Sequence, residues 1–234
     1  MLNAQEMGEI IRKVRKEKGL RLQELADNNI SPATISNIER GRSGVKFDKI
    51  EYLFEKLDIH MDKLTELLHK DKSETQELEN KLFVIETKRD IGMEEEALEE
   101  LKGINLPHDH QYAATVSYLM GKCYVSLGKL SRAERYLYEA IRLSKNHPYG
   151  TRSNIEADAF NYLAICSYRQ DEIERALTYT NSGIDAFNPE GERGELIHIL
   201  QVNRVNYLKN IGKITDALRE IDQMWDDIDV IDQP

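Results

Sequence analysis

Apolar residues recur at intervals of three and four along the N-terminal part of the chain, which is the spacing of one face of an α-helix. Met7, Ile10 and Ile11 form the first such run, and Gly19 follows where the pattern ends. Two more runs lie within residues 20–41, and others begin near positions 48 and 61. Five short helices are therefore expected within residues 1–69.

The second and third of these helices are separated by a short polar turn. Ser31 is a natural N-cap, and Pro32 takes the first helical position, where its missing N–H costs nothing. Ile35 and Ile38 supply the apolar face that seats the following helix. Two short helices joined in this way predict a helix-turn-helix, the motif that places its second helix in the major groove of DNA.

The candidate DNA contacts are short polar side chains that can approach base edges, together with cations that can neutralise phosphates. They lie on the outward face of the second helix of the motif and on its flanks. The set is Arg21, Gln23, Ser31, Ala33, Thr34, Ser36, Asn37, Arg40, Arg42 and Lys46.

Leu25 and Ala26, followed by the run S-x-x-x-I-S-x-I-E-x-G from Ser31 to Gly41, resemble the lambda-repressor/Cro class of DNA-binding domains, also called the XRE type. The resemblance implies an all-α, five-helix domain and a double-stranded DNA operator as partner. The simpler alternative is that this segment is a helical bundle that does not bind DNA and whose Arg and Lys side chains are only solvated at the surface.

Two features depart from the common pattern of this class. Leu22 stands where a polar residue is usual, so Arg21 or Gln23 is expected to make the corresponding backbone contact. The turn also lacks its usual glycine and holds Asn28 and Asn29. Because asparagine tolerates the left-handed backbone conformation better than most residues, these asparagines are predicted to replace that glycine.

From about residue 78 the chain repeats a pattern of small, aromatic and large residues. Its clearest copy holds Gly121, Tyr124, Gly128, Ala133, Leu137 and Ala140. The alanine equivalent to Ala133 recurs at intervals of 36, 43 and 41 residues, as Ala97, Ala133, Ala176 and Ala217. This pattern resembles the tetratricopeptide repeat and implies a right-handed solenoid of four helix pairs over residues 78–234, with the polar residues 70–77 as the junction.

Charge is distributed unevenly along the chain. Residues 1–70 hold 13 Lys and Arg against 12 Asp and Glu, a net charge of +1, whereas the remainder carries −11. DNA binding needs local positive charge. The cations counted toward it are Arg12, Lys13, Arg15, Lys16, Lys18, Arg21, Arg40, Arg42 and Lys46.

Other classes of function are not indicated. The chain lacks a G-x-x-x-x-G-K-S/T loop, a G-x-S-x-G motif and an H-E-x-x-H motif, so we expect no enzyme, no cofactor and no catalytic residue. His108, Asp109 and His110 could catch a metal, but an ordinary polar loop between repeats is favoured. Cys123 and Cys166 are expected to be small buried thiols. No signal peptide or apolar run of about 18 residues is present, which predicts a cytoplasmic protein without a membrane partner.

The first helix of each repeat is expected to line a concave wall. Asparagine on such a wall can donate to and accept from a peptide backbone at once, and nearby arginines can meet a carboxylate. The candidate peptide-binding residues are Tyr118, Lys122, Asp158, Asn161, Tyr168, Arg169, Arg204, Asn206 and Lys209.

An XRE-type domain joined directly to tetratricopeptide repeats is similar to the RRNPP family of peptide-sensing quorum-sensing regulators of Gram-positive bacteria. The resemblance implies a cytoplasmic homodimer that binds a short signalling peptide and thereby changes its affinity for an operator. Family members usually carry more repeats and a capping helix, so this chain is either a short relative or one that lacks C-terminal repeats. Trp225, in the last helix, is a candidate for an exposed contact surface.

Two alternatives stay open at this point. In the first, the repeats dock a protein partner instead of a peptide, and the DNA-binding domain is retained. In the second, the chain is a repeat adaptor whose helix-turn-helix no longer reads DNA, and Leu22 is the residue that favours it.

Overall fold

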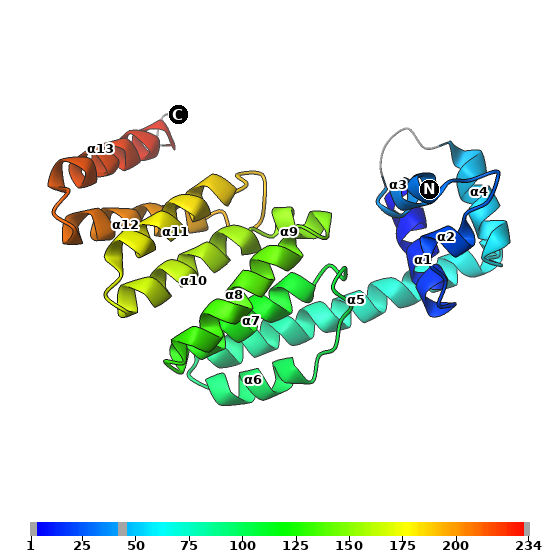
Figure 1. Cartoon of the computed structure of the whole chain (residues 1–234), viewed down its shortest axis with the longest axis horizontal. Coiled ribbons are helices and arrows are strands. Elements are labelled where there is room, and N and C mark those ends of the chain that lie inside the picture. Colours follow the sequence, from blue (N-terminus) through cyan, green and yellow to red (C-terminus); the bar gives the residue numbers. More distant parts are fainter. Residues whose placement is uncertain (1–3, 42–45, 232–234) are drawn as a thin grey trace. The chain divides into compact units, whose positions relative to one another are not determined.

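The computed structural model describes residues 4–41 and 46–231, with all side chains in these ranges except those of residues 4–5, 61–72, 148 and 226–231. Every regular element in these ranges is a helix, which confirms the all-α prediction (Figure 1). The chain divides into two compact units after Lys81. None of the helices in the described ranges combines the length and apolar composition that a bilayer span requires.

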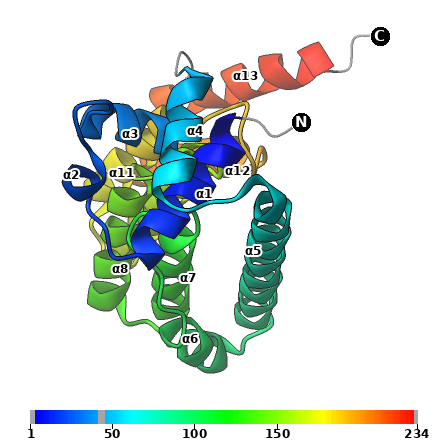
Figure 2. The ribbon, with the colours of Figure 1, turned by 90° about the vertical axis from the view of Figure 1, so that its right-hand side faces the viewer.

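The N-terminal unit holds helices built on the predicted apolar runs. Ile11, Ile35, Leu53 and Leu57 are fully buried in one core, and Leu25 joins them. Within this unit, α1 packs against α3 and α4, and α2 packs against α3 (Figure 2). The helices are α1 (Ala4–Glu17), α2 (Leu22–Leu25), α3 (Pro32–Glu39), α4 (Phe47–Lys56) and the first part of α5 (Met61–Asp90).

Helix α1 approaches α3 closely because a glycine lies at the crossing point. A Cβ atom built on Gly8 would lie 2.1 Å from the carbonyl oxygen of Ile38, so only glycine fits there. The predicted end of α1 is also confirmed, because Gly19 takes a φ of +69°, in the left-handed region that glycine adopts freely.

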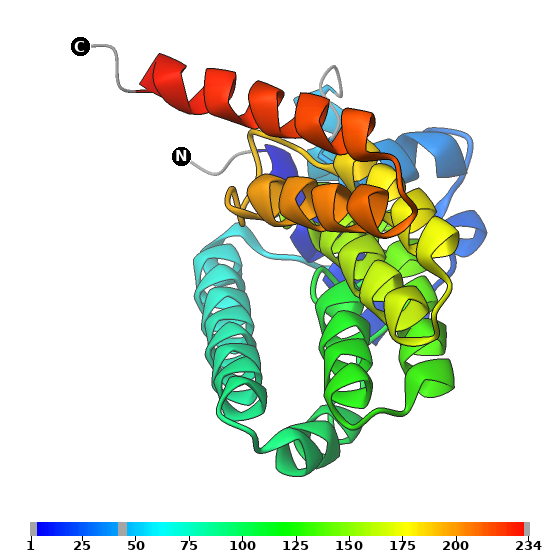
Figure 3. The same ribbon diagram turned by 90° about the vertical axis from the view of Figure 1, so that its left-hand side faces the viewer.

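The C-terminal unit is a stack of helix pairs (Figure 3). Helix α7 pairs with α8, α10 with α11, and α12 with α13. Residues of α5 beyond position 81 precede α6 directly in the chain, and Lys88 of α5 forms an ion pair with Glu100 of α6. Each pair contacts the next, as expected for a solenoid. The helices are α6 (Glu94–Lys102), α7 (Ala113–Ser126), α8 (Leu130–Ser144), α9 (Pro148–Arg152), α10 (Ile155–Arg169), α11 (Ile173–Ala186), α12 (Leu196–Asn210) and α13 (Ile214–Ile231).

The repeat pattern corresponds to specific packing positions. All four anchor alanines are buried, at 0 to 5% exposure. Each lies five positions after a turn residue with positive φ, and these residues are Gly92, Gly128, Asp171 and Gly212. A Cβ atom on Gly121 would lie 2.7 Å from the side chain of Leu137, which explains the small residue at that position.

Residues 70–77, where the sequence places the junction, lie inside α5. The absence of apolar periodicity in residues 70–77 does not by itself show whether the segment is helical. Its Lys, Glu and Gln residues favour helix, although a helix that is polar all round has no apolar stripe to reveal it.

Candidate nucleic-acid interface and ligand site

Helix α3 begins as the sequence predicts. The hydroxyl of Ser31 accepts the backbone N–H of Thr34 at 3.1 Å, and Pro32 follows the cap. Ile35 and Ile38 are buried at 0 and 2% exposure, so one face of the helix is fixed in the core and the other face is left outward.

The turn before α3 differs from the prediction. Neither Asn28 nor Asn29 has a positive φ, so the expected left-handed asparagine was wrong. Instead, the carboxylate of Asp27 accepts the backbone N–H of Asn29 at 2.8 Å and that of Ile30 at 3.1 Å. A carboxylate that accepts two successive N–H groups closes a turn without a left-handed residue.

Asp27 also ties the turn to α4. Its second carboxylate oxygen accepts hydrogen bonds from Lys56 Nζ and from the Tyr52 hydroxyl, both at 2.5 Å. The bond from Lys56, followed by that from Tyr52, holds the pKa of Asp27 well below its usual range. Lys49 Nζ donates to the carbonyl oxygen of Asn29 at 3.1 Å. Helix α4 therefore holds the turn that sets the direction of α3.

The face of α3 opposite Ile35 and Ile38 carries Ala33, Ser36 and Asn37 of the predicted contact residues, and Arg40 follows at the end of the helix. Among the described residues, the side chains of Ser36, Asn37 and Arg40 make no hydrogen bond or ion pair. Thr34 and Ser31 share a hydroxyl hydrogen bond at 2.9 Å. The side chains exposed to solvent are Arg21, Gln23, Ser31, Ala33, Arg40 and Lys46, while Thr34, Ser36 and Asn37 are half-buried and Arg42 lies outside the described residues.

Leu22 and Arg15 have structural positions that the sequence did not distinguish. Leu22 packs against the core, which explains an apolar residue at a position usually polar. Arg15, counted among the cations that would serve DNA, forms a buried ion pair with Glu39 at 2.6 and 2.9 Å. It also donates to the carbonyl oxygen of Leu20. Arg15 therefore joins α1 to α3 and is not a surface cation.

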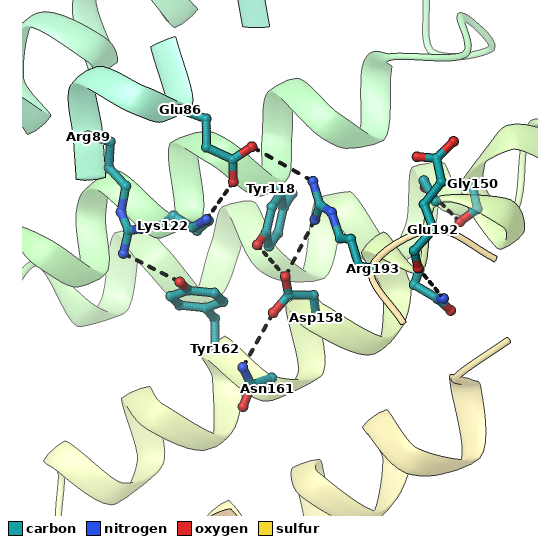
Figure 4. Close-up of polar contacts among 12 residues, drawn as sticks. Glu86, Arg89, Tyr118, Lys122, Gly150, Asp158, Asn161, Tyr162, Glu192 and Arg193 are labelled. Carbon is teal, nitrogen blue, oxygen red and sulfur yellow. Dashed lines mark hydrogen bonds and ion pairs between the residues drawn. The ribbon is translucent and has the colours of Figure 1, made fainter. Parts of the chain in front are cut away.

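In the C-terminal unit, four of the predicted peptide-binding residues meet in one cluster (Figure 4). The Tyr118 hydroxyl donates to Asp158 at 2.5 Å, and Asn161 donates to the same carboxylate at 3.3 Å. Lys122 pairs with Glu86 at 2.6 Å. We call the following set the polar cluster: Glu86, Arg89, Tyr118, Lys122, Asp158, Asn161, Tyr162 and Arg193.

The aromatic rings of the polar cluster face cations. Lys122 Nζ lies 5.2 Å from the centroid of the Tyr118 ring and 5.4 Å from that of Tyr162. Arg89 donates to the Tyr162 hydroxyl at 3.4 Å. Tyr118 is fully buried, and burial raises the pKa of its phenol, which therefore stays protonated and donates to Asp158.

The remaining predicted residues lie elsewhere in the described structure. Arg169 donates to the carbonyl oxygen of Val125 at 2.7 Å, and Arg204 pairs with Glu220 at 3.2 Å. The ring of Tyr168 packs on that of Tyr207. Asn206 and Lys209 are exposed on α12. Among the described residues, no hydrogen bond, ion pair or ring contact links Tyr168, Arg169, Arg204, Asn206 and Lys209 to the polar cluster.

Glu86, Arg89, Tyr162 and Arg193 were missed as members of the cluster. Glu86 had a signal, because it lies 36 residues before Lys122, the same interval that separates the anchor alanines of the first two repeats. Arg193 had none, since it comes from the loop between α11 and α12 and no repeat position corresponds to it.

The loop that holds His108 and His110 is a polar connection. A nitrogen of Arg142 lies 2.9 Å from His108 Nδ1, and His110 Nδ1 accepts the backbone N–H of Tyr112 at 3.1 Å. Among the residues that the structure describes, no three His, Cys, Asp or Glu side chains are grouped as metal ligands would be.

Comparison with known proteins identifies the class of the N-terminal domain. Residues 11–64 match the family model described as helix-turn-helix, so the chain carries a helix-turn-helix DNA-binding domain of the XRE type, as predicted. A search of curated proteins gave no significant sequence match.

Solved structures provide the comparison for the whole chain. BtubC (BKLC) from P. vanneervenii is 16% identical, with a TM-score of 0.55, covering 99% of this chain and 90% of that one, which shows a shared fold. PlcR of Bacillus thuringiensis, solved with the peptide PapR7 and DNA, is 16% identical with a TM-score of 0.49 and covers 96% of both chains. The SHP pheromone receptor Rgg2 of Streptococcus dysgalactiae is 14% identical with a TM-score of 0.35 and covers 95% of both.

Proposed function

We propose that this chain is a cytoplasmic, sequence-specific transcription regulator that reads a DNA operator through α3. Its repeat unit dimerises and binds a short signalling peptide, and the peptide changes the affinity for DNA. The observation that supports DNA recognition is the row Ser36, Asn37 and Arg40 on the outward face of a helix whose other face is fixed in the core. An amide can read an adenine edge, and a guanidinium can read guanine or neutralise a phosphate.

Peptide binding is supported by the composition of the polar cluster. Apart from Arg193, which comes from a loop, it combines carboxylates, cations, tyrosine rings and an asparagine amide from the first helices of three successive pairs, α5, α7 and α10. Asn203 of α12 extends this series, because its amide donates to Asn161 Oδ1 at 2.8 Å. Convergent polar groups on neighbouring repeats are the usual means by which a solenoid holds an extended ligand.

Dimerisation is supported by an apolar face on α13. Ile214, Leu218 and Trp225 are exposed at 51, 56 and 61%, and their spacing places them along one side of the helix. Exposed apolar residues gathered on one face are typical of an interaction surface.

The DNA proposal is tested by fluorescence anisotropy with DNA from upstream of the chain's own gene, at two salt concentrations. Asn37→Ala is expected to weaken specific binding about tenfold or more, the cost of one lost base contact. Arg40→Ala should lower affinity and reduce its salt dependence if it meets a phosphate. Arg219→Ala, which removes an exposed arginine from α13, is the matched control. Unchanged binding in both α3 variants would favour the adaptor alternative.

The peptide proposal uses the same assay with candidate peptides encoded in the neighbouring reading frame. Asn161→Ala is expected to abolish a peptide-dependent shift in DNA affinity, because Asn161 links the amide of Asn203 to the carboxylate of Asp158. Asn206→Ala tests the exposed wall of α12. Asn181→Ala, on the second helix of the third pair, is the control. Specific DNA binding that no peptide shifts would favour repeats that dock a protein partner.

A further inference from the structure

Arg193 places a cation in the polar cluster from outside the repeat helices. It belongs to the loop 187–195 between α11 and α12. Its guanidinium lies 3.4 Å from Asp158 Oδ2, 3.9 Å from Glu86 Oε2 and 5.0 Å from the centroid of the Tyr118 ring (Figure 4). The guanidinium therefore makes the contacts with two carboxylates and an aromatic face that a bound cationic group would make.

The loop that carries Arg193 is firmly held on its N-terminal side. The buried amide of Asn154 donates to the carbonyl oxygens of Asn188 and Glu192 at 2.9 and 2.7 Å. It also accepts the backbone N–H of Asn188 at 2.7 Å. A Cβ atom on Gly191 would lie 2.5 Å from the carbonyl oxygen of Arg152, so the loop backbone passes close to α9. These contacts fix the backbone immediately before Arg193.

Arg193 itself adopts an unfavourable backbone conformation. Its φ is +58°, in the left-handed region. The other described non-glycine residues with positive φ are Asp58, Asn154 and Asp171, which are the residue types that tolerate this region best. An arginine has no such tolerance, so the chain accepts local strain in order to place this guanidinium in the cluster.

We propose that Arg193 is an internal substitute for a cationic group of the ligand, and that an arginine, lysine or terminal ammonium of the peptide displaces it from Asp158 and Glu86. The inference rests on the proposed peptide binding and names the chemistry that the peptide must carry. The Arg193 side chain then fills the empty site and moves out when the ligand takes its place, while the loop backbone stays held by Asn154.

The charges left behind select a cation. When Arg193 leaves, Glu86 keeps Lys122 at 2.6 Å. Among the residues that the structure describes, Asp158 then keeps two neutral donors alone, the hydroxyl of Tyr118 and the amide of Asn161. The side chain of Asp158 is only 14% exposed, and a poorly solvated carboxylate without a cation is unfavourable. A neutral or anionic ligand group would leave that charge uncompensated.

In the proposed site, a ligand cation must compete with the Arg193 side chain, which is tethered to the chain, and the test is designed around this competition. A group held on a short loop acts at an effective concentration of about millimolar or above, so a free guanidinium should compete poorly in the wild-type chain. Removing the Arg193 side chain should release the site to a free guanidinium. Arg193→Gly is the variant of choice, because glycine adopts positive φ freely and keeps the loop conformation.

The probe is Nα-acetylarginine amide, whose single charge is a guanidinium, and its neutral isostere Nα-acetylcitrulline amide is the matched ligand. Binding to the full chain is measured by isothermal titration and by ligand-observed NMR. Arg193→Gly is expected to bind the arginine probe about tenfold or more tightly than wild type, with no gain for citrulline. Adding Asp158→Asn to Arg193→Gly should reverse the gain. Arg152→Ala, which removes a neighbouring exposed arginine paired with Glu192, should bind like wild type.

Equal binding of the two probes, or no gain in Arg193→Gly, would overturn the proposal. Arg193→Asn, which also tolerates positive φ, is a second variant if the glycine variant does not keep its helical circular dichroism. Failure of this test would leave the peptide assay unaffected. Conversely, a guanidinium that binds Arg193→Gly while no peptide shifts DNA affinity would count against peptide sensing alone.

Discussion

Asp27 and Asp171 lie in turns where glycine is the usual residue. Each aspartate allows the chain to turn without a glycine, but in a different way. Asp27 uses its carboxylate to close the turn before α3, whereas Asp171 adopts the positive φ that Gly92, Gly128 and Gly212 adopt in the other pairs. The Asp171 position follows from the repeat frame. The tie from Asp27 to α4 does not follow from the sequence, because Tyr52 and Lys56 reach its carboxylate only in the folded domain.

The charge on Asp27 should make the N-terminal unit sensitive to acid. Its pKa is lowered in the folded state, so its contribution to stability is present above the unfolded pKa of about 4 and is lost as the pH falls below it. Asp27→Asn keeps an oxygen for the two backbone N–H groups but loses the ionic bond to Lys56. The variant should melt at a lower temperature than wild type at pH 7, and the difference should shrink by pH 3.

Differential scanning calorimetry across this pH range checks the prediction. Asp58→Asn, at an exposed aspartate of the same unit, is the matched control and should melt nearly as wild type does throughout. A wild-type advantage that stays constant from pH 7 to pH 3 would show that the carboxylate charge does not stabilise the turn.

Asp171→Gly should stabilise the repeat unit. Asp171 has a φ of +62°, and an L-residue pays a free-energy penalty there that glycine does not pay. We expect the free energy of unfolding to rise by about 1 kcal/mol, measured by urea denaturation. Asp171→Asn removes the charge but keeps a side chain that tolerates this region, and it should change little. A similar gain in both variants would assign the effect to charge.

At the level of elements, the sequence predicted the features that depend on residues close together in the chain. The cap at Ser31, the stop at Gly19 and the four anchor alanines were readable because each depends on near neighbours in sequence. The burial of Arg15 against Glu39 was not, since a cation in an amphipathic helix looks the same whether its partner is water or a carboxylate 24 residues away. Four members of the polar cluster, Tyr118, Lys122, Asp158 and Asn161, were named from their positions on the repeat helices, whereas the loop that supplies Arg193 gave no such signal.

The contact between α1 and α3 should depend on Gly8. Gly8→Ala would place a methyl group 2.1 Å from the Ile38 carbonyl oxygen, and backbone atoms cannot move aside as a flexible side chain can. The two helices must separate, which should lower the free energy of unfolding by about 3 kcal/mol or more. Because Ile38 lies on α3, DNA binding should weaken as well.

Gly194→Ala is the matched control for this substitution. No atom lies within 4 Å of the Cβ position at Gly194, and its φ is not positive. We expect a change within about 0.5 kcal/mol. Chemical denaturation followed by circular dichroism measures both variants, and equal stability of the two would show that α1 and α3 are not in close contact at Gly8.

For the whole molecule, net charge and exposed apolar surface are divided between the N-terminal part and the repeat part, as the proposed DNA binding and the proposed dimerisation would require. Residues 1–70 carry a net charge of +1 and the remainder −11, so the acidic repeat part does not add to the net positive charge that DNA binding requires. The apolar face of α13 lies in the acidic part. The proposed dimer would therefore form through apolar contacts of the acidic unit, away from the helix-turn-helix in the sequence.

Leu218→Glu should convert a dimer into a monomer. Leu218 is 56% exposed at the centre of the α13 face, so a carboxylate there costs little in the monomer but would be desolvated in a dimer. Size-exclusion chromatography with light scattering gives the mass directly. Arg219→Glu, which changes charge at the neighbouring position, is the control and should remain dimeric. A wild-type chain that is monomeric at micromolar concentration would contradict the proposed dimer.

The two cysteines give this protein an internal chemical reporter. Cys123 of α7 and Cys166 of α10 are free and buried, and burial raises the pKa of each thiol to about 11. An alkylating reagent needs an exposed thiolate, so each cysteine can react only when its own helix pair opens. The two positions are separated by 43 residues, as are the anchor alanines of their pairs. Their separate labelling rates therefore measure the local opening of two adjacent repeats without an introduced dye. A ligand that bridges α7 and α10 should slow the labelling of both cysteines.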